Sequence, residues 1–232
     1  MSLMEINRMS SGYGRTVIDR EIQLKVEYGK ILCVLGRNGV GKSTLLKTIM
    51  GIVETFEGEI SFDGARITGL KPFQIANMGI AYAPQESALF DNLSVEQNLK
   101  VGLPRQSTSF STICEEAFRI FPILKERLKQ EAGTLSGGEK KMLLMARAMI
   151  RSPKLIILDE ITEGVQPSVI DNISNALRKM NEQGVSVLLV EQNVDFALSV
   201  AHSYAVMNQG QIVINDLVDQ NSRLRIEQYM AV

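Results

Sequence analysis

The chain has 232 residues, 45% hydrophobic and 22% charged, and this composition predicts a globular protein with a substantial core in one large or two small domains. A formal net charge of −1 argues against a general nucleic-acid-binding protein, because such proteins neutralise phosphates with an excess of Lys and Arg. The apolar runs are far shorter than the ~20 residues that span a bilayer, and residues 1–10 lack a signal peptide's apolar segment, so we expect a soluble, intracellular chain.

Two segments of alternating hydrophobicity open the chain and predict antiparallel strands. They cover residues 4–9 and 22–26, with a turn expected at residues 11–12. Tyr13 follows this turn on an expected loop. Its ring could stack on a nucleotide base or simply pack against the protein.

Residues 31–35 are five consecutive apolar residues that predict a buried strand, and a glycine-rich turn after them leads into an apolar-periodic helix. In this turn Gly36, Gly41, Lys42 and Ser43 fit the spacing G-x4-G-K-[ST]. The glycines would let backbone N–H groups converge on phosphate oxygens, and the helix adds its positive end. Lys42 would reach the terminal phosphates, and the Ser43 hydroxyl would bind Mg²⁺. We predict a nucleoside triphosphate site rather than a glycine-rich turn without a ligand.

Short strands are expected at residues 58–62 and 80–83, with Gly51 as the C-terminal cap of the helix after the glycine-rich turn. Gln85 comes just past the second of these strands. A polar side chain in this place could face a ligand crevice or lie on a solvated loop.

The middle third of the chain, residues 91–151, is predicted to be an inserted helical subdomain. Helices are expected over about 113–121 and 123–128, and a stretch rich in Pro, Ser and Thr, residues 104–112, is expected to be a surface excursion.

At the end of this subdomain, the sequence Ser136-Gly137-Gly138 precedes another apolar-periodic helix. A hydroxyl and several unpaired N–H groups at a helix start suit a phosphate, although the same pattern could be an ordinary N-cap.

Residues 155–158 form an unbroken apolar strand that ends in Asp159 and Glu160. Carboxylates at the C-terminal end of a parallel strand face the crevice in which α/β sheets bind ligands. Asp159 would hold Mg²⁺ through water, and Glu160 would orient or deprotonate the attacking water. A solvated acidic strand end is the alternative, and the phosphate-binding pattern upstream makes it the weaker one.

The last part of the chain continues the α/β pattern. A helix is expected from Pro167, a buried strand over residues 185–190 that ends near Gln192, a hairpin over 204–214 and a short helix over 224–230.

Together these motifs resemble the ATP-binding subunit of ABC transporters, in the expected order and over nearly the whole chain. The sequence LSGG between a phosphate loop and an acidic strand end is highly specific, because other P-loop ATPases lack it. The resemblance implies an α/β P-loop fold with a mainly parallel core sheet, an antiparallel N-terminal β portion and the inserted helical subdomain. It implies one ABC ATPase domain over residues 1–232, with the nucleotide-binding core at about 1–90 and 152–232.

The resemblance also implies that the cofactors are ATP and Mg²⁺, and it gives the site residues their roles. Tyr13 would stack on adenine and Gln85 would sense Mg²⁺ and the attacking water, whereas Ser136, Gly137 and Gly138 would contact the γ-phosphate held by a partner subunit. The implied nucleotide-binding residues of the phosphate loop are Gly36, Arg37, Asn38, Gly39, Val40, Gly41, Lys42, Ser43 and Thr44. The implied Mg²⁺ ligands are Ser43, Gln85 and Asp159, and the implied catalytic residues are Lys42, Glu160 and Gln192.

The sequence departs from the family pattern at three places. Ile161 stands where proline is usual, which restores a backbone N–H and some flexibility to the loop after Glu160. Lys140 and Lys141 follow the signature, the LSGGE sequence of residues 135–139, at positions where glutamines are common in the family. Gln192 occupies the position of the usual histidine. A glutamine amide can donate and accept hydrogen bonds, but it cannot carry a proton or a positive charge at physiological pH.

The single histidine and the two cysteines, residue types that often act in catalysis or metal binding, are not expected to have a functional role here. His202, the only histidine, is expected on the surface. Cys33 and Cys114 lack metal or redox spacing and are expected to be reduced thiols in the core.

The function implied by the resemblance is ATP hydrolysis coupled to solute import, at the cytoplasmic face of the cell membrane. The implied partners are a second ABC ATPase subunit, membrane permease subunits and an external solute-binding protein, and no nucleic acid is expected. More narrowly, residues 162–164 and 190–193 resemble importers of branched-chain amino acids, amides and urea, and residues 36–41 and 163–170 resemble most the urea and short-chain amide members. Two alternatives are a soluble ABC ATPase of translation or DNA repair and a regulatory nucleotide binder that does not hydrolyse ATP.

The loop after Gln85 carries apolar residues that could touch a permease. Leu89, Phe90 and Leu93 could either dock a cytoplasmic helix of the permease or pack inside the helical subdomain.

Overall fold

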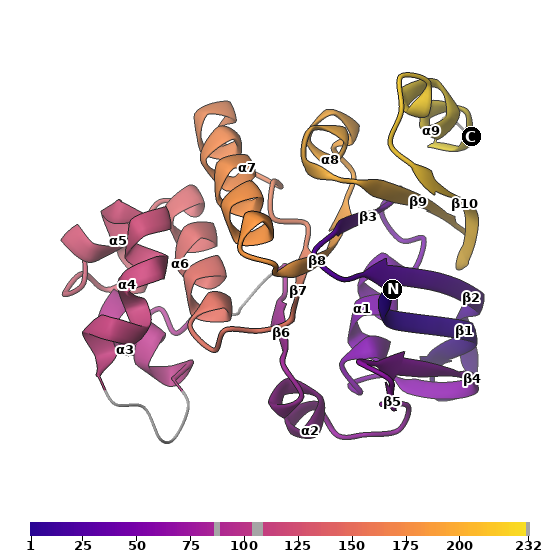
Figure 1. Cartoon of the computed structure of the whole chain (residues 1–232), viewed down its shortest axis with the longest axis horizontal. Helices are drawn as coiled ribbons and strands as arrows, with labels where there is room; N and C mark the ends of the chain where they lie inside the picture. Colours follow the sequence, from indigo (N-terminus) through magenta and orange to yellow (C-terminus); the bar gives the residue numbers. More distant parts are fainter. Residues whose placement is uncertain (86–88, 104–108, 231–232) are drawn as a thin grey trace.

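The computed structural model describes residues 1–85, 89–103 and 109–230, arranged in three parts along the long axis of the molecule (Figure 1). A helical part lies at one end, a four-stranded antiparallel sheet lies at the other end, and a six-stranded sheet lies between them. The helical part consists of α3 (Val95–Val101), α4 (Phe110–Ile120), α5 (Pro122–Glu126), the short 3-10 helix η1 (Ala132–Thr134) and α6 (Gly137–Met149).

The antiparallel sheet has the strand order β2-β1-β4-β5. Its strands are β1 (Ser2–Tyr13), β2 (Thr16–Glu27), β4 (Glu54–Phe62) and β5 (Ala65–Arg66). The predicted N-terminal strands are therefore confirmed, but the turn predicted at residues 11–12 is wrong. The first strand continues to Tyr13, which pairs with Thr16, and the chain turns at Gly14, whose φ is +58°. A Cβ on Gly12 would lie 1.9 Å from the carbonyl oxygen of Thr16, so this glycine permits close strand pairing.

The six-stranded sheet has the order β10-β9-β3-β8-β7-β6, parallel except for its edge strand β10. Its strands are β3 (Ile31–Leu35), β6 (Ile80–Ala83), β7 (Leu155–Asp159), β8 (Ser186–Glu191), β9 (Ser203–Asn208) and β10 (Gln211–Leu217). Every residue of β3, β7 and β8 is buried, which explains their continuous apolar runs. Because these three strands are parallel neighbours, their C-terminal ends meet at one edge of the sheet.

Side chains on the two faces of this sheet enter two separate hydrophobic clusters. On β3, Cys33 faces the cluster built with α6 and α7 (Pro167–Glu182), whereas Val34 faces the cluster built with α1 (Lys42–Ile49) and the antiparallel sheet. Cys33 and Cys114 are free and buried, as predicted. The strand alternation therefore fixes the antiparallel sheet to one face and the large helices to the other.

The helices predicted from the sequence are present, with small shifts at their ends. Gly51 has a φ of +68° just past α1, as a C-terminal cap requires. The remaining helices are α2 (Pro72–Asn77), α8 (Val194–Val200) and α9 (Ser222–Met230). The sequence pattern does not predict α2, because six residues are too few to show a helical period.

Part of the surface excursion predicted at residues 104–112 lies outside the described residues, and its end belongs to α4, which begins at Phe110. Within the part of the chain that the structure describes, no helix combines the length and the apolar character needed to cross a membrane.

A buried carboxyl group links the antiparallel sheet to α1. Asp19 on β2 is fully buried, and its Oδ2 accepts a hydrogen bond of 2.7 Å from the Ser11 hydroxyl, which in turn accepts one of 2.8 Å from Thr48 on α1. The other oxygen, Oδ1, has no hydrogen-bond partner among the described residues. Burial raises the pKa of Asp19 to about 7, and the hydrogen bond from Ser11 opposes this shift only in part.

This raised pKa predicts a pH-dependent stability. Between pH ~4 and ~7 the folded chain keeps a proton on Asp19 that the unfolded chain releases, so the free energy of unfolding falls as pH rises through this window. The loss should amount to about 2 kcal/mol between pH 5 and pH 7. Urea unfolding across this range should show the loss in wild type and little of it in Asp19→Asn. The same slope in both proteins would contradict the assignment.

Candidate functional site

Glycines shape the loop that joins β3 to α1. Gly39 and Gly41 have φ values of +81° and +115°, in the region that favours glycine. Gly36 lies against the neighbouring chain segment, since a Cβ there would be 2.6 Å from the carbonyl oxygen of Met207. The helix α1 begins at Lys42, directly after this loop, so its first backbone N–H groups are available to a ligand. The loop therefore has the shape of an anion-binding cradle, which fits a phosphate.

The Lys42 side chain is buried beneath the loop with three acceptors around its ammonium group. Its Nζ lies 2.9 Å from the carbonyl oxygens of Gly36 and Arg37 and 2.9 Å from Oε1 of Glu160. The Lys42 and Glu160 side chains are only 4% and 6% exposed. Three acceptors match the three N–H donors of an ammonium, so both buried charges are compensated.

Glu160 is the point at which the predicted catalytic residues meet. Its carboxylate accepts hydrogen bonds from Nε2 of Gln85 at 2.9 Å and from Nε2 of Gln192 at 3.3 Å, in addition to the ion pair with Lys42. These residues follow β6, β8 and β3, three parallel strands of one sheet. Glu160 itself has a φ of +47°, which is rare for a residue with a side chain and is typical of functional sites.

Ser43 and Asp159 bring two oxygens together beside this cluster. The Ser43 hydroxyl donates to Oδ1 of Asp159 at 3.2 Å, and the Tyr82 hydroxyl donates to Oδ2 at 3.3 Å. Burial raises the pKa of Asp159, and the hydrogen bond from Ser43 opposes the shift. Mg²⁺ is usually bound by one or two carboxylates together with phosphate and water oxygens, so this hydroxyl and carboxylate fit it. Gln85, the third predicted ligand, directs its amide to Glu160 and Glu163.

Gln192 connects the phosphate loop to the acidic strand end. It is half-buried, and its Nε2 lies within hydrogen-bonding reach of both the Asn38 side chain and Glu160. The position at which the family resemblance leads us to expect a histidine is therefore occupied by a neutral side chain, which contacts both the phosphate loop and Glu160. His202 is exposed, as predicted, and accepts a hydrogen bond of 3.1 Å from the N–H of Ile31 at its Nδ1.

The other predicted residues of the phosphate loop surround this cluster at different depths. Arg37 and Asn38 are exposed, whereas Val40 and Thr44 are partly buried. Tyr13, at the end of β1, is 52% exposed, so its ring is available for stacking.

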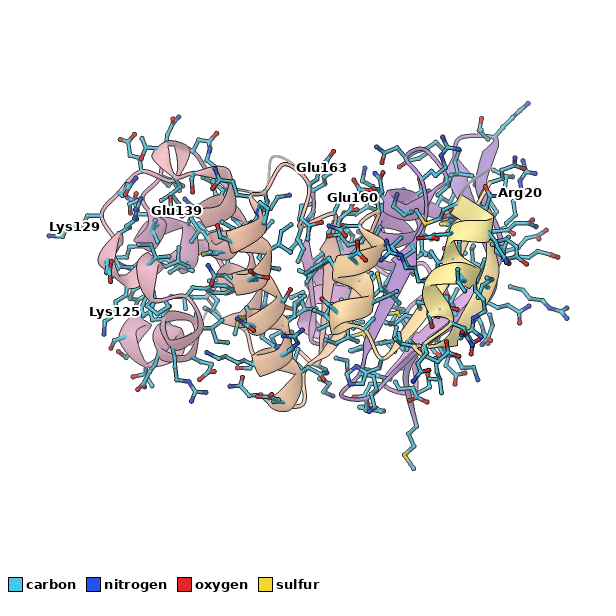
Figure 2. All side chains as sticks on the ribbon, turned by 90° about the horizontal axis from the view of Figure 1, so that it is seen from above. Arg20, Lys125, Lys129, Glu139, Glu160 and Glu163 are labelled. Carbon is cyan, nitrogen blue, oxygen red and sulfur yellow. The ribbon has the colours of Figure 1, made fainter. Side chains whose placement is uncertain are left out.

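The signature residues lie on the helical part of the molecule. Ser136 caps α6: its hydroxyl accepts a hydrogen bond of 3.3 Å from the N–H of Glu139, whose carboxylate accepts one of 2.9 Å from the N–H of Ser136. Figure 2 shows Glu139 in the helical part and Glu160 in the middle of the molecule. Ser136 and Gly137 are exposed, but Gly138 is buried, and a Cβ there would lie 2.6 Å from Val169 of α7. Close packing of α6 on α7 is therefore a sufficient reason for a glycine at 138.

Glu191 and Thr162 form a contact that the sequence pattern does not predict. The Glu191 carboxylate is buried at the end of β8 and accepts hydrogen bonds from the N–H and the hydroxyl of Thr162, at 3.1 and 2.8 Å. The sequence predicts that Ile161 makes this loop flexible, but the Ile161 side chain is 1% exposed and packs in the core. The backbone after Glu160 is thus held by the core packing of Ile161 and by the hydrogen bonds of Thr162 to Glu191. The only feature of the sequence that could have pointed to this contact is the acidic residue Glu191 directly before Gln192.

Thr162→Val tests the strength of this contact. The substitution keeps the side-chain shape but removes a hydroxyl that donates to a buried carboxylate, so it should lower the free energy of unfolding by about 1–3 kcal/mol. Urea unfolding measures the loss. Thr134→Val is the matched control, because the Thr134 hydroxyl donates to the Glu131 carbonyl on the exposed surface, and it should cost less than about 0.5 kcal/mol. Equal costs for both variants would show that the buried hydroxyl adds no more to stability than the exposed one.

Comparison with known proteins identifies the family. The sequence model of the ABC transporter family matches residues 20–163. The chain is 36% identical over 215 residues to the high-affinity branched-chain amino acid transport ATP-binding protein BraG of Pseudomonas aeruginosa, covering 92% of each chain. It is 31% identical over 227 residues to the lipopolysaccharide export system ATP-binding protein LptB of Haemophilus influenzae, covering 95% of this chain and 92% of that protein.

A solved structure supports the same conclusion. The ADP conformation of an ATP-binding cassette of an ABC transporter matches with a TM-score of 0.86 and 25% identity, over 98% of this chain and 95% of that one. The glycine loop, the acidic strand end and the signature helix are thus parts of a known architecture. The chain belongs to the ABC transporter family and is a nucleotide-binding ATPase subunit with the α/β P-loop fold of ABC cassettes.

Proposed function

We propose that this chain hydrolyses ATP with Mg²⁺ to drive the import of a small solute, and that it works at the cytoplasmic face of a membrane, held by permease subunits. The observation that carries the catalytic part is the convergence of Lys42, Gln85 and Gln192 on the buried carboxylate of Glu160. Hydrolysis needs a cation for the phosphates and a base for the attacking water, and this cluster contains both.

Branched-chain amino acids are the solute class that the similarities favour. BraG, which is named for their transport, is 36% identical to this chain, against 31% for LptB, which is named for lipopolysaccharide export. The proposal of urea and short-chain amides rests only on the resemblance of residues 36–41 and 163–170 to their importers. An external solute-binding protein belongs to the same proposal. The alternative, a soluble ABC ATPase, has less support because these relatives are named as transport subunits.

The chain's own residues suggest how the reaction proceeds. Lys42 is already held by the loop carbonyls, so arriving phosphates can compete with Glu160 for its ammonium group. A carboxylate oxygen of Glu160 then becomes available to the attacking water, while the amides of Gln85 and Gln192 keep the carboxylate oriented. Ser43 and Asp159 would hold Mg²⁺, which neutralises charge on the phosphates when bound.

A second ABC ATPase subunit, identical or related, completes the proposed assembly. The signature residues lie outside the cluster around Glu160, and Ser136 and Gly137 are exposed at the N-terminus of the 13-residue helix α6. An exposed helix start suits an anion supplied by another molecule, so the γ-phosphate in the partner subunit's site is the proposed ligand.

Two substitutions separate binding from chemistry. Lys42→Ala should lose most ATP affinity and turnover, and it should also destabilise the fold because Glu160 is left buried without its partner. Glu160→Gln should bind ATP almost as wild type does but lower kcat by about 100-fold or more, since an amide cannot accept the proton. Equilibrium binding of a fluorescent ATP analogue and steady-state ATPase assays measure the two effects.

Lys179→Ala, at an exposed position on α7, is the control for losing a lysine and should behave as wild type. Wild-type turnover by Glu160→Gln would show that another group activates the water and would overturn the proposed role of Glu160.

An apolar groove between α2 and the helical part is the proposed docking site for the permease. Phe73, Ile52 and Val101 are 63%, 56% and 55% exposed and line the same groove, so their apolar side chains are gathered at one place on the surface. Of the apolar residues on the loop after Gln85, Phe90 is 51% exposed, whereas Leu89 packs against the core. The groove joins the central sheet to the helical part, so a permease segment held there would contact both.

Phe73→Asp tests this docking site in the assembled transporter. A carboxylate in an apolar interface should reduce solute transport by about 10-fold or more, while ATP affinity of the isolated chain stays unchanged. Leu217→Asp, at a residue 70% exposed on β10, is the matched control and should leave transport intact. Normal transport by Phe73→Asp would place the docking site elsewhere.

A further inference from the structure

Lys141 extends from the second turn of α6 into the catalytic cluster. Its Nζ donates to the backbone carbonyl oxygen of Gln85 at 3.3 Å and to that of Glu160 at 3.2 Å. Both acceptors lie in loops of the central sheet, whereas α6 belongs to the helical part. One ammonium group therefore connects the signature helix to the two loops that carry the catalytic carboxylate and its glutamine partner.

The hydrogen bond from Lys141 to the carbonyl oxygen of Glu160 holds a residue whose backbone conformation is unusual. The φ of +47° at Glu160 is sterically costly and persists only where neighbouring groups hold it. The N–H of Glu160 donates to the carbonyl oxygen of Val190 at 3.0 Å, and two residues later Glu191 holds Thr162. The carbonyl oxygen between these two contacts is the one that Lys141 binds, so the lysine fixes the peptide group that follows the catalytic residue.

The surroundings of Lys141 suit a charged donor. Its side chain is half-buried, and burial lowers its pKa, while the nearby carboxylates of Glu163, Glu191 and Asp159 oppose that shift. The neighbouring Lys140 lies differently: its ammonium group pairs with Asp91 at 3.3 Å, and the carboxylate of Asp91 is mostly exposed. Of these two adjacent lysines of α6, Lys141 thus contacts the catalytic cluster, whereas Lys140 pairs with a carboxylate on the surface.

We propose that Lys141 is a positioning residue for ATP hydrolysis, which holds the backbone of Glu160 and Gln85 and makes turnover depend on where α6 lies relative to the central sheet. The proposal rests on the roles proposed above for Glu160 and Gln85. It assigns the signature helix a second task besides any contact with a partner subunit, since the same helix then adjusts the hydrolytic site of its own chain.

The test compares Lys141→Met, Lys141→Arg and Lys140→Met in steady-state ATPase and ATP-binding assays. Methionine keeps the length and volume but removes the donors, so kcat should fall about 10- to 100-fold, because small displacements of a catalytic group are costly. The KM and affinity for ATP should stay within about twofold, since Lys141 contacts neither the phosphate loop nor Ser43 in the described hydrogen bonds. Lys141→Arg, which keeps the charge and donors, should recover most of the loss, and Lys140→Met should match wild type.

Wild-type kcat in Lys141→Met would overturn the proposal. So would a parallel loss of kcat, ATP affinity and thermal stability that Lys141→Arg does not recover, because this pattern indicates a purely structural role. If Lys141→Met does not fold, Lys141→Gln is measured with the same expectation, since its amide is too short to reach both carbonyls. Glu160→Gln, assayed in parallel, separates the two claims: slow turnover there with normal turnover in Lys141→Met rejects only the role of Lys141.

Discussion

A buried ion pair between Lys42 and Glu160 is the interaction on which the rest of the site depends. Two charges this well shielded from water are tolerated only when each has its partner, so the phosphate loop and the end of β7 must lie together. The fold provides this because β3, β8 and β7 are parallel neighbours whose C-terminal ends share one edge. We propose that a ligand bringing negative charge to the loop competes for the lysine and releases the carboxylate. On this proposal, the ion pair between Lys42 and Glu160 keeps the site ready for ATP.

Much of this site could be predicted from the sequence, because its signals are local. The spacing of Gly36, Gly41 and Lys42 depends on one turn, and Asp159 and Glu160 directly follow an apolar run, so neither pattern needs knowledge of the fold. The roles of these residues stay predictions, but the structure brings them together.

Contacts between distant segments could not be predicted in the same way. Thr162 and Glu191 are separated by a helix along the chain, and nothing in either residue type indicates that they meet. Gly12 likewise reads as a turn residue in the sequence, whereas in the structure it permits the close pairing of β1 with β2. Glycine serves both purposes, so the sequence does not distinguish them. In the sequence Lys141 is only a departure from the family pattern, and its two carbonyl partners become visible once α6 is placed beside the loops.

A structure with Mg²⁺ and a non-hydrolysable ATP analogue tests the central role of the Lys42–Glu160 pair most directly. We expect the phosphates to occupy the glycine loop, the Lys42 ammonium group to contact them in place of Glu160, and the metal to lie on Ser43 and Asp159. Phosphates bound in the loop with the Lys42–Glu160 pair still intact, or a nucleotide bound elsewhere, would contradict this role.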